Sequence, residues 1–186
     1  TFLSNAIPSN SATPFDLTFL LKNPSIEDNS GWSEKPTVNF SCAEFYEKTF
    51  NMYQTLVDMP AGTYRMTAQA FQRPGDITGS YNNYVGGNSN ISTKLYINAD
   101  MQPVKHIASE AEDAKLHDDD ATAGEPAIYF PNTMASAAAY FANGKYNNEI
   151  SSTLTDEGDL TIGIMCDHSE GAYWSIFDNF KLFYYG

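Results

Sequence analysis

The chain has 186 residues, of which 42% are hydrophobic, so it is long enough to bury one substantial core and too apolar to be disordered. Its formal net charge is −13, from 10 basic and 23 acidic residues, which disfavours nucleic acid as a partner because phosphate binding needs a basic face. No stretch approaches the 18 apolar residues of a membrane-spanning helix, so we expect no membrane insertion.

Residues 1–14 are rich in Ser, Asn and Pro and are predicted to be a linker, which leaves residues 15–186 as a single domain. Apolar and polar side chains alternate through much of this domain, and residues 64–70 show the pattern most clearly. Such alternation is typical of a half-buried strand in an antiparallel sheet. In chain order, strands are predicted at residues 15–22, 37–44, 51–57, 64–70, 95–99, 127–130, 147–154, 160–164 and 173–184.

Turn residues separate these strands. The segments 58–64 (DMPAGTY) and 155–159 (TDEGD) place Pro and Gly, or Gly alone, between two strands, which favours hairpins. The last strand is apolar on both faces, so we expect it to lie in the centre of a sheet. Many short strands with this punctuation indicate a β-sandwich or a barrel.

One helix is predicted at about residues 134–143. Met134, Ala137, Ala138 and Phe141 recur at helical spacing, and Gly144 can end the helix. Asn132 or Thr133 can cap its start. We expect this helix to cover an open end or edge of the sandwich.

Two long segments, residues 74–90 and 100–126, are predicted to be loops, and long loops in a compact domain are often functional. The first combines Tyr81 and Tyr84 with Gly, Asn and Ser, which is the composition of adaptable recognition loops, and Arg73 and Asp76 stand at its root. The alternative is a flexible, solvated loop. The acidic run at residues 118–120, in the second segment, is interpreted as solvated.

Nothing in the sequence predicts catalysis. There is no Gly-x-Ser-x-Gly nucleophile motif, the histidines have no zinc spacing, and no two carboxylates are singled out as a catalytic pair. Cys42 and Cys166 each share parity with apolar neighbours, so we expect two buried free thiols, with a disulfide as the alternative. We therefore predict that the protein is not an enzyme.

Two motifs carry a family resemblance. The segment 20–32 (LLKNPSIEDNSGW), paired with the terminal segment 173–185 (YWSIFDNFKLFYY), resembles the galactose-binding-like jelly rolls, which include many carbohydrate-binding modules. The segments 53–75 and 130–150 look like accessory domains of secreted Bacteroidetes proteins. The resemblance implies an all-β jelly-roll sandwich of two antiparallel sheets with one short helix, secreted or at the cell surface (extracellular or periplasmic).

The resemblance also implies a structural Ca²⁺ ion. The positions that match the family's ligands are Glu27 and Asp178, with Asn23 or Ser25 supplying a backbone oxygen, and hard oxygen donors are the ligands that Ca²⁺ prefers. The alternative is that Asp178 only accepts backbone hydrogen bonds at the root of a loop.

The sequence thus predicts noncatalytic binding of a polysaccharide or other glycan. Its candidate contacts are Arg73, Asp76, Tyr81, Tyr84 and Trp174, although the parity of Trp174 with Ile176, Phe180 and Leu182 favours burial in the core. The alternative is a structural or protein-interaction domain that contacts neighbouring domains of a larger cell-surface chain, without sugar binding. One fold hosts many functions, so the resemblance does not decide between them.

Overall fold

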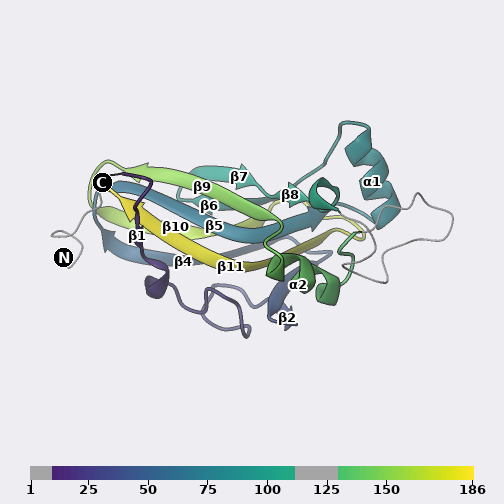
Figure 1. The fold of residues 1–186 in the computed structure, drawn as a ribbon, viewed down its shortest axis with the longest axis horizontal. Helices are drawn as coiled ribbons and strands as arrows, with labels where there is room; N and C mark the ends of the chain where they lie inside the picture. The colour runs from purple at the N-terminus through teal and green to yellow at the C-terminus, as the bar shows by residue number, and fades with distance from the viewer. Residues whose placement is uncertain (1–9, 112–129) are drawn as a thin grey trace.

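A computed structural model describes residues 10–111 and 130–186, which form two β-sheets packed face to face (Figure 1). The path of the seven-stranded sheet is β2 (Thr37–Asn39), β3 (Cys42–Tyr46), β11 (Trp174–Tyr185), β5 (Gly62–Arg73) and β8 (Lys105–His106); β1 (Phe15–Asp16) pairs with β11, and β9 (Asn147–Leu154) pairs with β5. The four-stranded sheet is ordered β4 (Phe50–Met59), β10 (Gly158–Cys166), β6 (Thr93–Ile97) and β7 (Asp100–Pro103).

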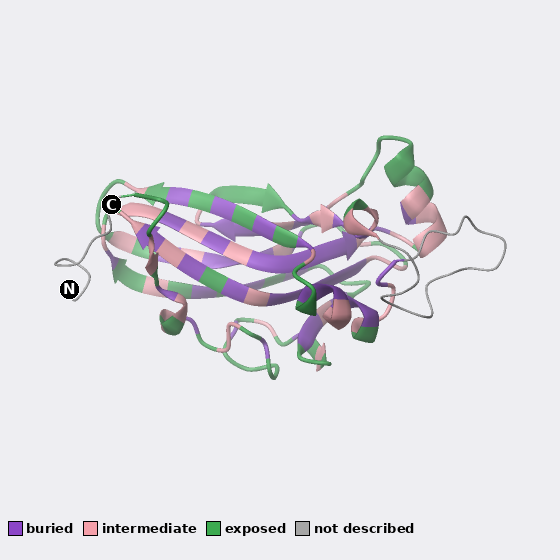
Figure 2. Cartoon of the chain, in the orientation of Figure 1, coloured by how far each residue is buried: buried purple, intermediate pink, exposed green. Residues whose placement is uncertain are grey.

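The chain is therefore an all-β sandwich, as the alternating pattern predicts. Every pairing between its described strands is antiparallel except the short contact of β5 with β8, which is parallel. Buried and exposed residues alternate along β9, which Figure 2 shows as bands. The predicted central position of the last strand is confirmed, because β11 lies between β3 and β5.

Aromatic and aliphatic side chains fill the space between the sheets. The ring of Phe45 stacks on Phe50 at 4.1 Å and lies 6.0 Å from Phe177, so strands of both sheets meet through these rings. Trp32 contacts Phe180 at 4.8 Å and closes the side of this core near the loop at residues 23–31. Burial of such large rings is a principal source of stability in a core.

A bulge in β11 changes which of its side chains face the sandwich core. The register against β5 shifts between Asp178 and Lys181, and Asn179 between them has a positive φ of 54°. Before the bulge, Trp174 and Ile176 face outward into a second apolar cluster, whereas Phe180, beyond it, faces the sandwich core. The sequence predicted that Trp174, Ile176 and Phe180 lie on one face of the strand. That prediction is wrong, because the extra residue in β11 reverses the alternation.

The second cluster lies beneath helix α2 (Met134–Ala142), which confirms the predicted helix and covers part of the outer face of the seven-stranded sheet. Phe71, Tyr140 and Tyr146 are buried there. The ring of Tyr146 lies 4.7 Å from the ring of Phe71 and 5.7 Å from the ring of Tyr140. The two cysteines are buried free thiols, as expected, but Cys42 belongs to this cluster and Cys166 to the sandwich core.

The expectation of a single helix and of a loop at residues 74–90 is wrong. Helix α1 (Ile77–Val85) occupies most of that segment and projects from the end of the sandwich opposite the C-terminus (Figure 1). Its Asn and Gly residues have low helix propensity. The carboxylate of Asp76 accepts a hydrogen bond from the backbone N–H of Gly79 at 2.7 Å, and Tyr81 packs 5.5 Å from Phe130. Capping and tertiary packing therefore override the local preference.

Other predicted boundaries also differ. The strand expected at residues 15–22 is only β1, followed by a 3₁₀-helix at Thr18–Leu20. A turn with positive φ at Phe40 and Ser41 divides the strand expected at 37–44 into β2 and β3. The segment at 100–126 begins with β7, β8 and a second 3₁₀-helix, Ile107–Glu110. The acidic run 118–120 and most of the strand expected at 127–130 lie outside the described residues.

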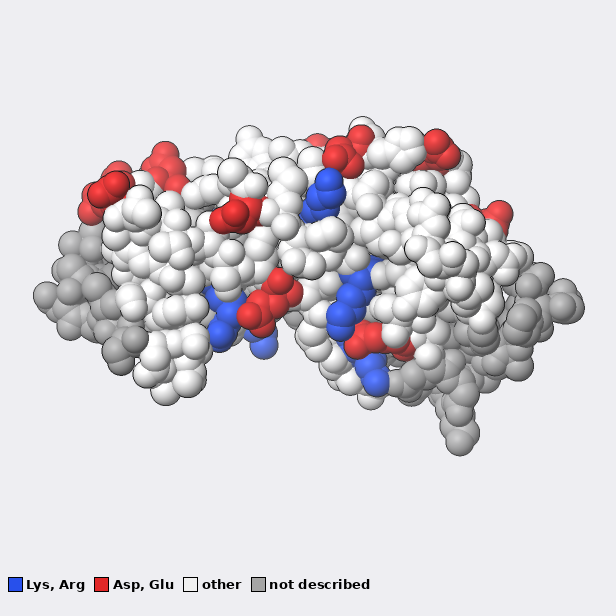
Figure 3. Space-filling model, turned by 90° about the horizontal axis from the view of Figure 1, so that it is seen from above, with Lys and Arg blue, Asp and Glu red and all other residues white. Residues whose placement is uncertain are grey.

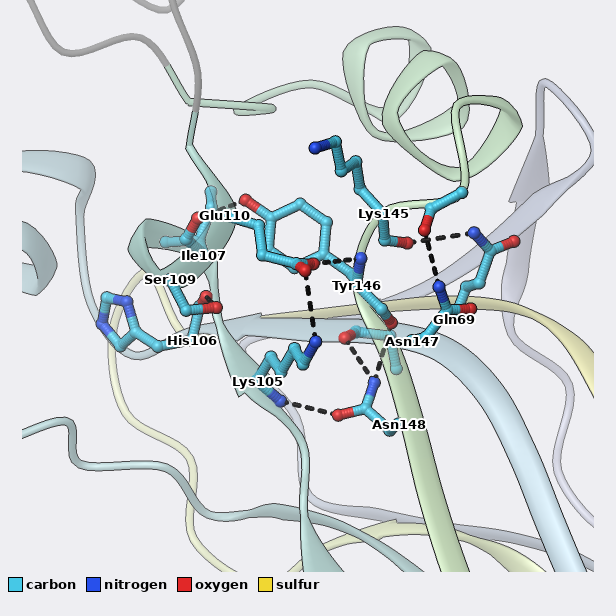
Figure 4. Close-up of polar contacts among 12 residues, drawn as sticks. Gln69, Lys105, His106, Ile107, Ser109, Glu110, Lys145, Tyr146, Asn147 and Asn148 are labelled. Atoms are coloured by element: carbon cyan, nitrogen blue, oxygen red, sulfur yellow. Dashed lines mark hydrogen bonds and ion pairs between the residues drawn. The ribbon is translucent and has the colours of Figure 1, made fainter.

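A group of polar contacts fastens residues 105–110 to the sheet (Figure 4). The backbone N–H of Lys105 donates to Asn148 Oδ1 at 3.0 Å, and its ammonium group lies 3.2 Å from Glu110 Oε1. The second oxygen of Glu110 accepts the backbone N–H of Tyr146. These contacts hold β8 in place at the point where β5 passes from pairing with β9 to pairing with β8.

On the face shown in Figure 3, acidic side chains are spread singly over the surface, and the Lys and Arg side chains do not form a continuous strip. Among residues 10–111 and 130–186, no helix combines the length and the apolar character needed to cross a lipid bilayer.

Candidate functional site

A row of three side chains crosses the outer face of the seven-stranded sheet at one end. In the strand register, Tyr46 on β3 lies opposite Trp174 on β11, and Trp174 lies opposite Arg73 on β5. Neighbouring strands are about 4.8 Å apart, so the row spans roughly 10 Å. Two of the sequence-predicted sugar contacts, Arg73 and Trp174, are therefore neighbours in the fold although about 100 residues separate them in the sequence.

A cavity of about 250 Å³ opens over this row. Helix α2 begins beside it, so residues that precede and start the helix also line it. The described residues of the lining are Glu44, Tyr46, Arg73, Asn132, Thr133, Met134 and Trp174. The cavity thus combines aromatic rings with a few converging polar groups, which is the usual composition of a small-ligand site.

Trp174 is buried beneath the cavity and positions the side chains that line it. Only 4% of its surface is exposed, and its ring packs at 5.4 Å edge-on to Phe71 in the cluster below. Its indole N–H donates to the Glu44 carboxylate. The prediction that Trp174 is buried is confirmed, although it lies beneath α2 and not between the sheets.

Tyr46 is the exposed aromatic residue at the rim, with 52% of its surface accessible. Its neighbours in the register hold it on a rigid sheet, since β3 pairs with both β2 and β11. A flat ring in this setting can pack against the apolar C–H face of a ligand while its hydroxyl hydrogen-bonds with Arg73.

Arg73 is fixed by three hydrogen bonds. Its Nε donates to the Gly75 carbonyl at 2.9 Å, Nη1 to Asn132 Oδ1 at 2.6 Å and Nη2 to the Ala172 carbonyl at 3.1 Å. Its guanidinium lies 5.2 Å above the Trp174 ring, within range of a cation–π interaction.

Arg73 stays charged in the cavity although its burial opposes the charge. Burial lowers the pKa of the Arg73 guanidinium, and nearby Tyr46, Asp76 and Glu44 oppose that shift. An arginine keeps its proton in either case, because its pKa starts far above neutral pH. The cavity therefore places one fixed cation beside one carboxylate.

The N-terminus of α2 is positioned by its cap. Thr133 Oγ1 accepts the backbone N–H of Ser136 at 3.1 Å, which starts the helix at Met134. The preceding residue, Asn132, then reaches Arg73. The helix and the sheet are thus joined by polar contacts at the cavity itself.

The other three predicted sugar contacts lie outside the lining of this cavity. Asp76 caps α1, and Tyr81 packs against Phe130 in the cluster beneath α2. Tyr84 stacks on His106 at 4.7 Å with an angle of 24° between the ring planes. Each of these side chains has a structural contact of its own, so they do not converge with Arg73 on a single site.

The residues expected to bind Ca²⁺ occupy a different region. Asp178 is buried, and burial raises the pKa of its carboxyl to about 7, with a smaller contribution from the charge of Glu27. One Asp178 oxygen accepts the backbone N–H of Asn179 at 2.7 Å, within β11 at its bulge rather than at the root of a loop, and Glu27 accepts from the Ser41 hydroxyl at 3.2 Å.

Asn23 has a structural role in the loop. Its amide donates to the carbonyls of Asp28 and Ser30, both at 2.9 Å, and its side-chain oxygen accepts the backbone N–H of Glu27 at 3.0 Å. The side chain therefore closes the loop, and the backbone carbonyl of Asn23 already accepts from Trp32 Nε1 and from the backbone N–H of Ile26. In the described part of the chain, no three His, Cys, Asp or Glu side chains are grouped as metal ligands.

Sequence reasoning missed Tyr46 and Glu44. The alternation in residues 42–46 places Cys42, Glu44 and Tyr46 on one face, and that signal could have been read from the sequence. The sequence could not show that this face meets Arg73 and the start of α2, because the strands that carry them are far apart in the chain.

Fold and site together define the chain as a β-sandwich with a small aromatic and polar cavity on the outer face of one sheet. No protein-family model matches the sequence, and neither the curated proteins nor the solved structures contain a match.

Proposed function

We propose that the chain is a noncatalytic glycan-binding module of the galactose-binding-like jelly-roll type, secreted or displayed at the cell surface, and that it contacts sugar at the cavity beside Tyr46. The observation that carries the proposal is an exposed aromatic ring, Tyr46, held on a rigid sheet beside Arg73 and Glu44. Sugar rings present an apolar C–H face and a rim of hydroxyl groups, and the cavity offers a partner for each.

The arrangement of carboxylates supports binding without chemistry. Among the described residues, Glu44 is the only carboxylate that lines the cavity, and it already accepts the indole N–H of Trp174. Glycoside hydrolysis generally uses two carboxyl groups that face each other across the bond to be cleaved.

Affinity electrophoresis through gels containing soluble polysaccharides tests the proposal. The panel is xylan, galactan, mannan, arabinan, laminarin and hydroxyethylcellulose. The wild-type chain is expected to be retarded by at least one of them, and Tyr46→Ala is expected to lose that retardation. Tyr84→Ala is the matched control, since it removes a tyrosine that packs on His106 outside the cavity. Equal retardation of the wild type and Tyr46→Ala would place binding elsewhere.

The alternative proposal is a structural or protein-interaction domain of a larger cell-surface protein. Val57 on β4 and Met101 on β7, the two edge strands of the four-stranded sheet, favour it, because each is an apolar side chain left largely exposed, at 66% and 51%, at an edge that a neighbouring domain could cover. Failure of every polysaccharide to retard the wild type would support this alternative over glycan binding.

We also propose a structural Ca²⁺ ion held by Glu27 and Asp178. The buried Asp178 carboxyl and its unfavourable interaction with the charge of Glu27 support it, because a cation between the two would relieve both costs. Thermal melts with EDTA and with 5 mM CaCl₂, at roughly neutral pH, test it. Ca²⁺ is expected to raise the melting temperature of the wild type and not that of Asp178→Asn; no effect on the wild type would exclude the site.

A further inference from the structure

The cavity retains hydrogen-bonding capacity that the fold does not use. Arg73 has five N–H bonds; three donate to the Gly75 and Ala172 carbonyls and to Asn132, and the Tyr46 side chain is a further hydrogen-bond partner, so among the described residues one donor remains. Glu44 accepts from Trp174 through Oε2, and no described residue donates to Oε1. A charged donor and a charged acceptor therefore line one small cavity, and both are anchored through Trp174.

This pairing matches the chemistry of two adjacent hydroxyl groups. One hydroxyl can donate its proton to a carboxylate while its neighbour accepts from a guanidinium, so a vicinal diol satisfies both residues at once. We propose that the cavity binds a neutral sugar ring through a vicinal diol held between Glu44 and Arg73, with Tyr46 against the ring. This inference rests on the proposed function and specifies the class of sugar.

The electrostatics favour a neutral sugar over an acidic one. Three protein acceptors, the Gly75 and Ala172 carbonyls and the Asn132 amide oxygen, already surround the Arg73 guanidinium. Among the described residues only Trp174 donates to the Glu44 carboxylate, and the negative charge of this group repels a carboxylate brought into the same cavity. The net charge of −13 adds a weaker, salt-screened repulsion of anions.

The size of the cavity favours a single ring. Its volume of about 250 Å³ lies below the usual range for drug-sized ligands, roughly 300–1,000 Å³, so it has room for one sugar residue and not for several. Thr133 and Met134, at the start of α2, line the cavity together with Tyr46.

The test is an NMR titration of the ¹⁵N-labelled chain with methyl glycosides in matched pairs. Methyl glucoside and methyl galactoside are each compared with the corresponding uronoside, in which a carboxylate replaces the C6 hydroxymethyl group. The neutral member of at least one pair is expected to bind about tenfold or more tightly than its uronoside. Removing one hydroxyl of the bound diol, in the 2-, 3- or 4-deoxy glycosides, is expected to cost a similar factor.

Glu44→Gln gives the decisive readout. Glutamine keeps an acceptor for the Trp174 N–H and removes the charge, so the preference for the neutral member should shrink to less than about threefold. Glu149→Gln, at an exposed position of β9, is the control, because it removes a carboxylate from the same sheet outside the cavity. This variant should keep the full preference for the neutral glycoside. An unchanged melting temperature confirms that both variants are folded.

The outcomes separate the two proposals. Binding that depends on Tyr46, with equal affinity for neutral and acidic members or with no cost from any deoxy sugar, would overturn the diol inference and leave glycan binding intact. A preference for the uronoside would overturn it as well. Absence of binding to every glycoside and every polysaccharide would remove the proposed function itself.

Discussion

The guanidinium of Arg73 lies 5.2 Å from the centre of the Trp174 ring, and the indole N–H of that tryptophan donates to Glu44. One buried ring thus fixes two oppositely charged side chains from two different strands. Because Trp174 is anchored in the cluster beneath α2, the geometry of the candidate site depends on the packing of that helix.

Arg73 should contribute to stability as well as to binding. Two of its three hydrogen bonds join β5 to the segments before α2 and β11, and the third holds the Gly75 carbonyl, so Arg73→Met is expected to lower the free energy of unfolding by about 2–3 kcal/mol. Urea denaturation measures this. Arg65→Met, on the same face of β5 and with one hydrogen bond, to Ser11, at 3.3 Å, should cost about 0.5 kcal/mol. Equal costs would contradict the structural role of Arg73.

Gly163 should not tolerate a side chain. A Cβ atom at this position of β10 would lie 2.9 Å from the Cβ of Tyr53 and closer still to the Met52 carbonyl oxygen. Gly163→Ala is therefore expected to destabilise the fold by about 1–3 kcal/mol in urea denaturation. Gly171→Ala is the control, because nothing lies within 4 Å of its Cβ position, and it should change stability by less than about 0.5 kcal/mol.

His106 should make stability depend on pH. It is buried, its Nδ1 accepts the backbone N–H of Ala108 at 2.9 Å, and no described residue bonds to Nε2. Burial lowers the pKa of His106 from 6.5 to about 4, so the unfolded chain binds a proton between these values and the folded chain does not. Its contribution is therefore complete above pH 6.5 and is lost as the pH falls toward 4.

The His106 contribution can be isolated by substitution. Between pH 7 and pH 4, the wild type is expected to lose about 1–3 kcal/mol more than His106→Gln, which cannot titrate in this range. The measurement is urea denaturation at several pH values. Identical pH profiles for the two proteins would show that His106 is protonated as readily in the folded chain as in the unfolded one.

Asp76 should act as a helix cap. Its carboxylate accepts the Gly79 N–H at 2.7 Å, so Asp76→Ala is expected to lower the free energy of unfolding by about 1 kcal/mol. Asp76→Asn keeps an oxygen at the cap and should cost less than half of that. Neither variant is expected to change retardation in polysaccharide gels, and a loss of retardation in a stable Asp76→Asn variant would restore this residue as a sugar contact.

The sequence by itself determined the local elements. Alternation along residues 147–154 matches β9 residue for residue, and the helical spacing of residues 134–141 places α2 correctly, because these patterns record which face of each element is buried. The helix at 77–85 was missed because its Asn and Gly residues do not favour a helix, and it is stabilised by the Asp76 cap and by packing of Tyr81 on Phe130 and of Tyr84 on His106.

The tertiary structure decided the candidate site. Asn179 inserts an extra residue into β11, so Trp174 faces α2 while Phe180 faces the sandwich core, and no alternating pattern reveals such a reversal. The meeting of Tyr46 with Arg73 likewise depends on which strands pair with β11 and in what register. Strand pairing is a long-range choice set by the packing of the whole core, so residues distant in sequence become neighbours only when the chain folds.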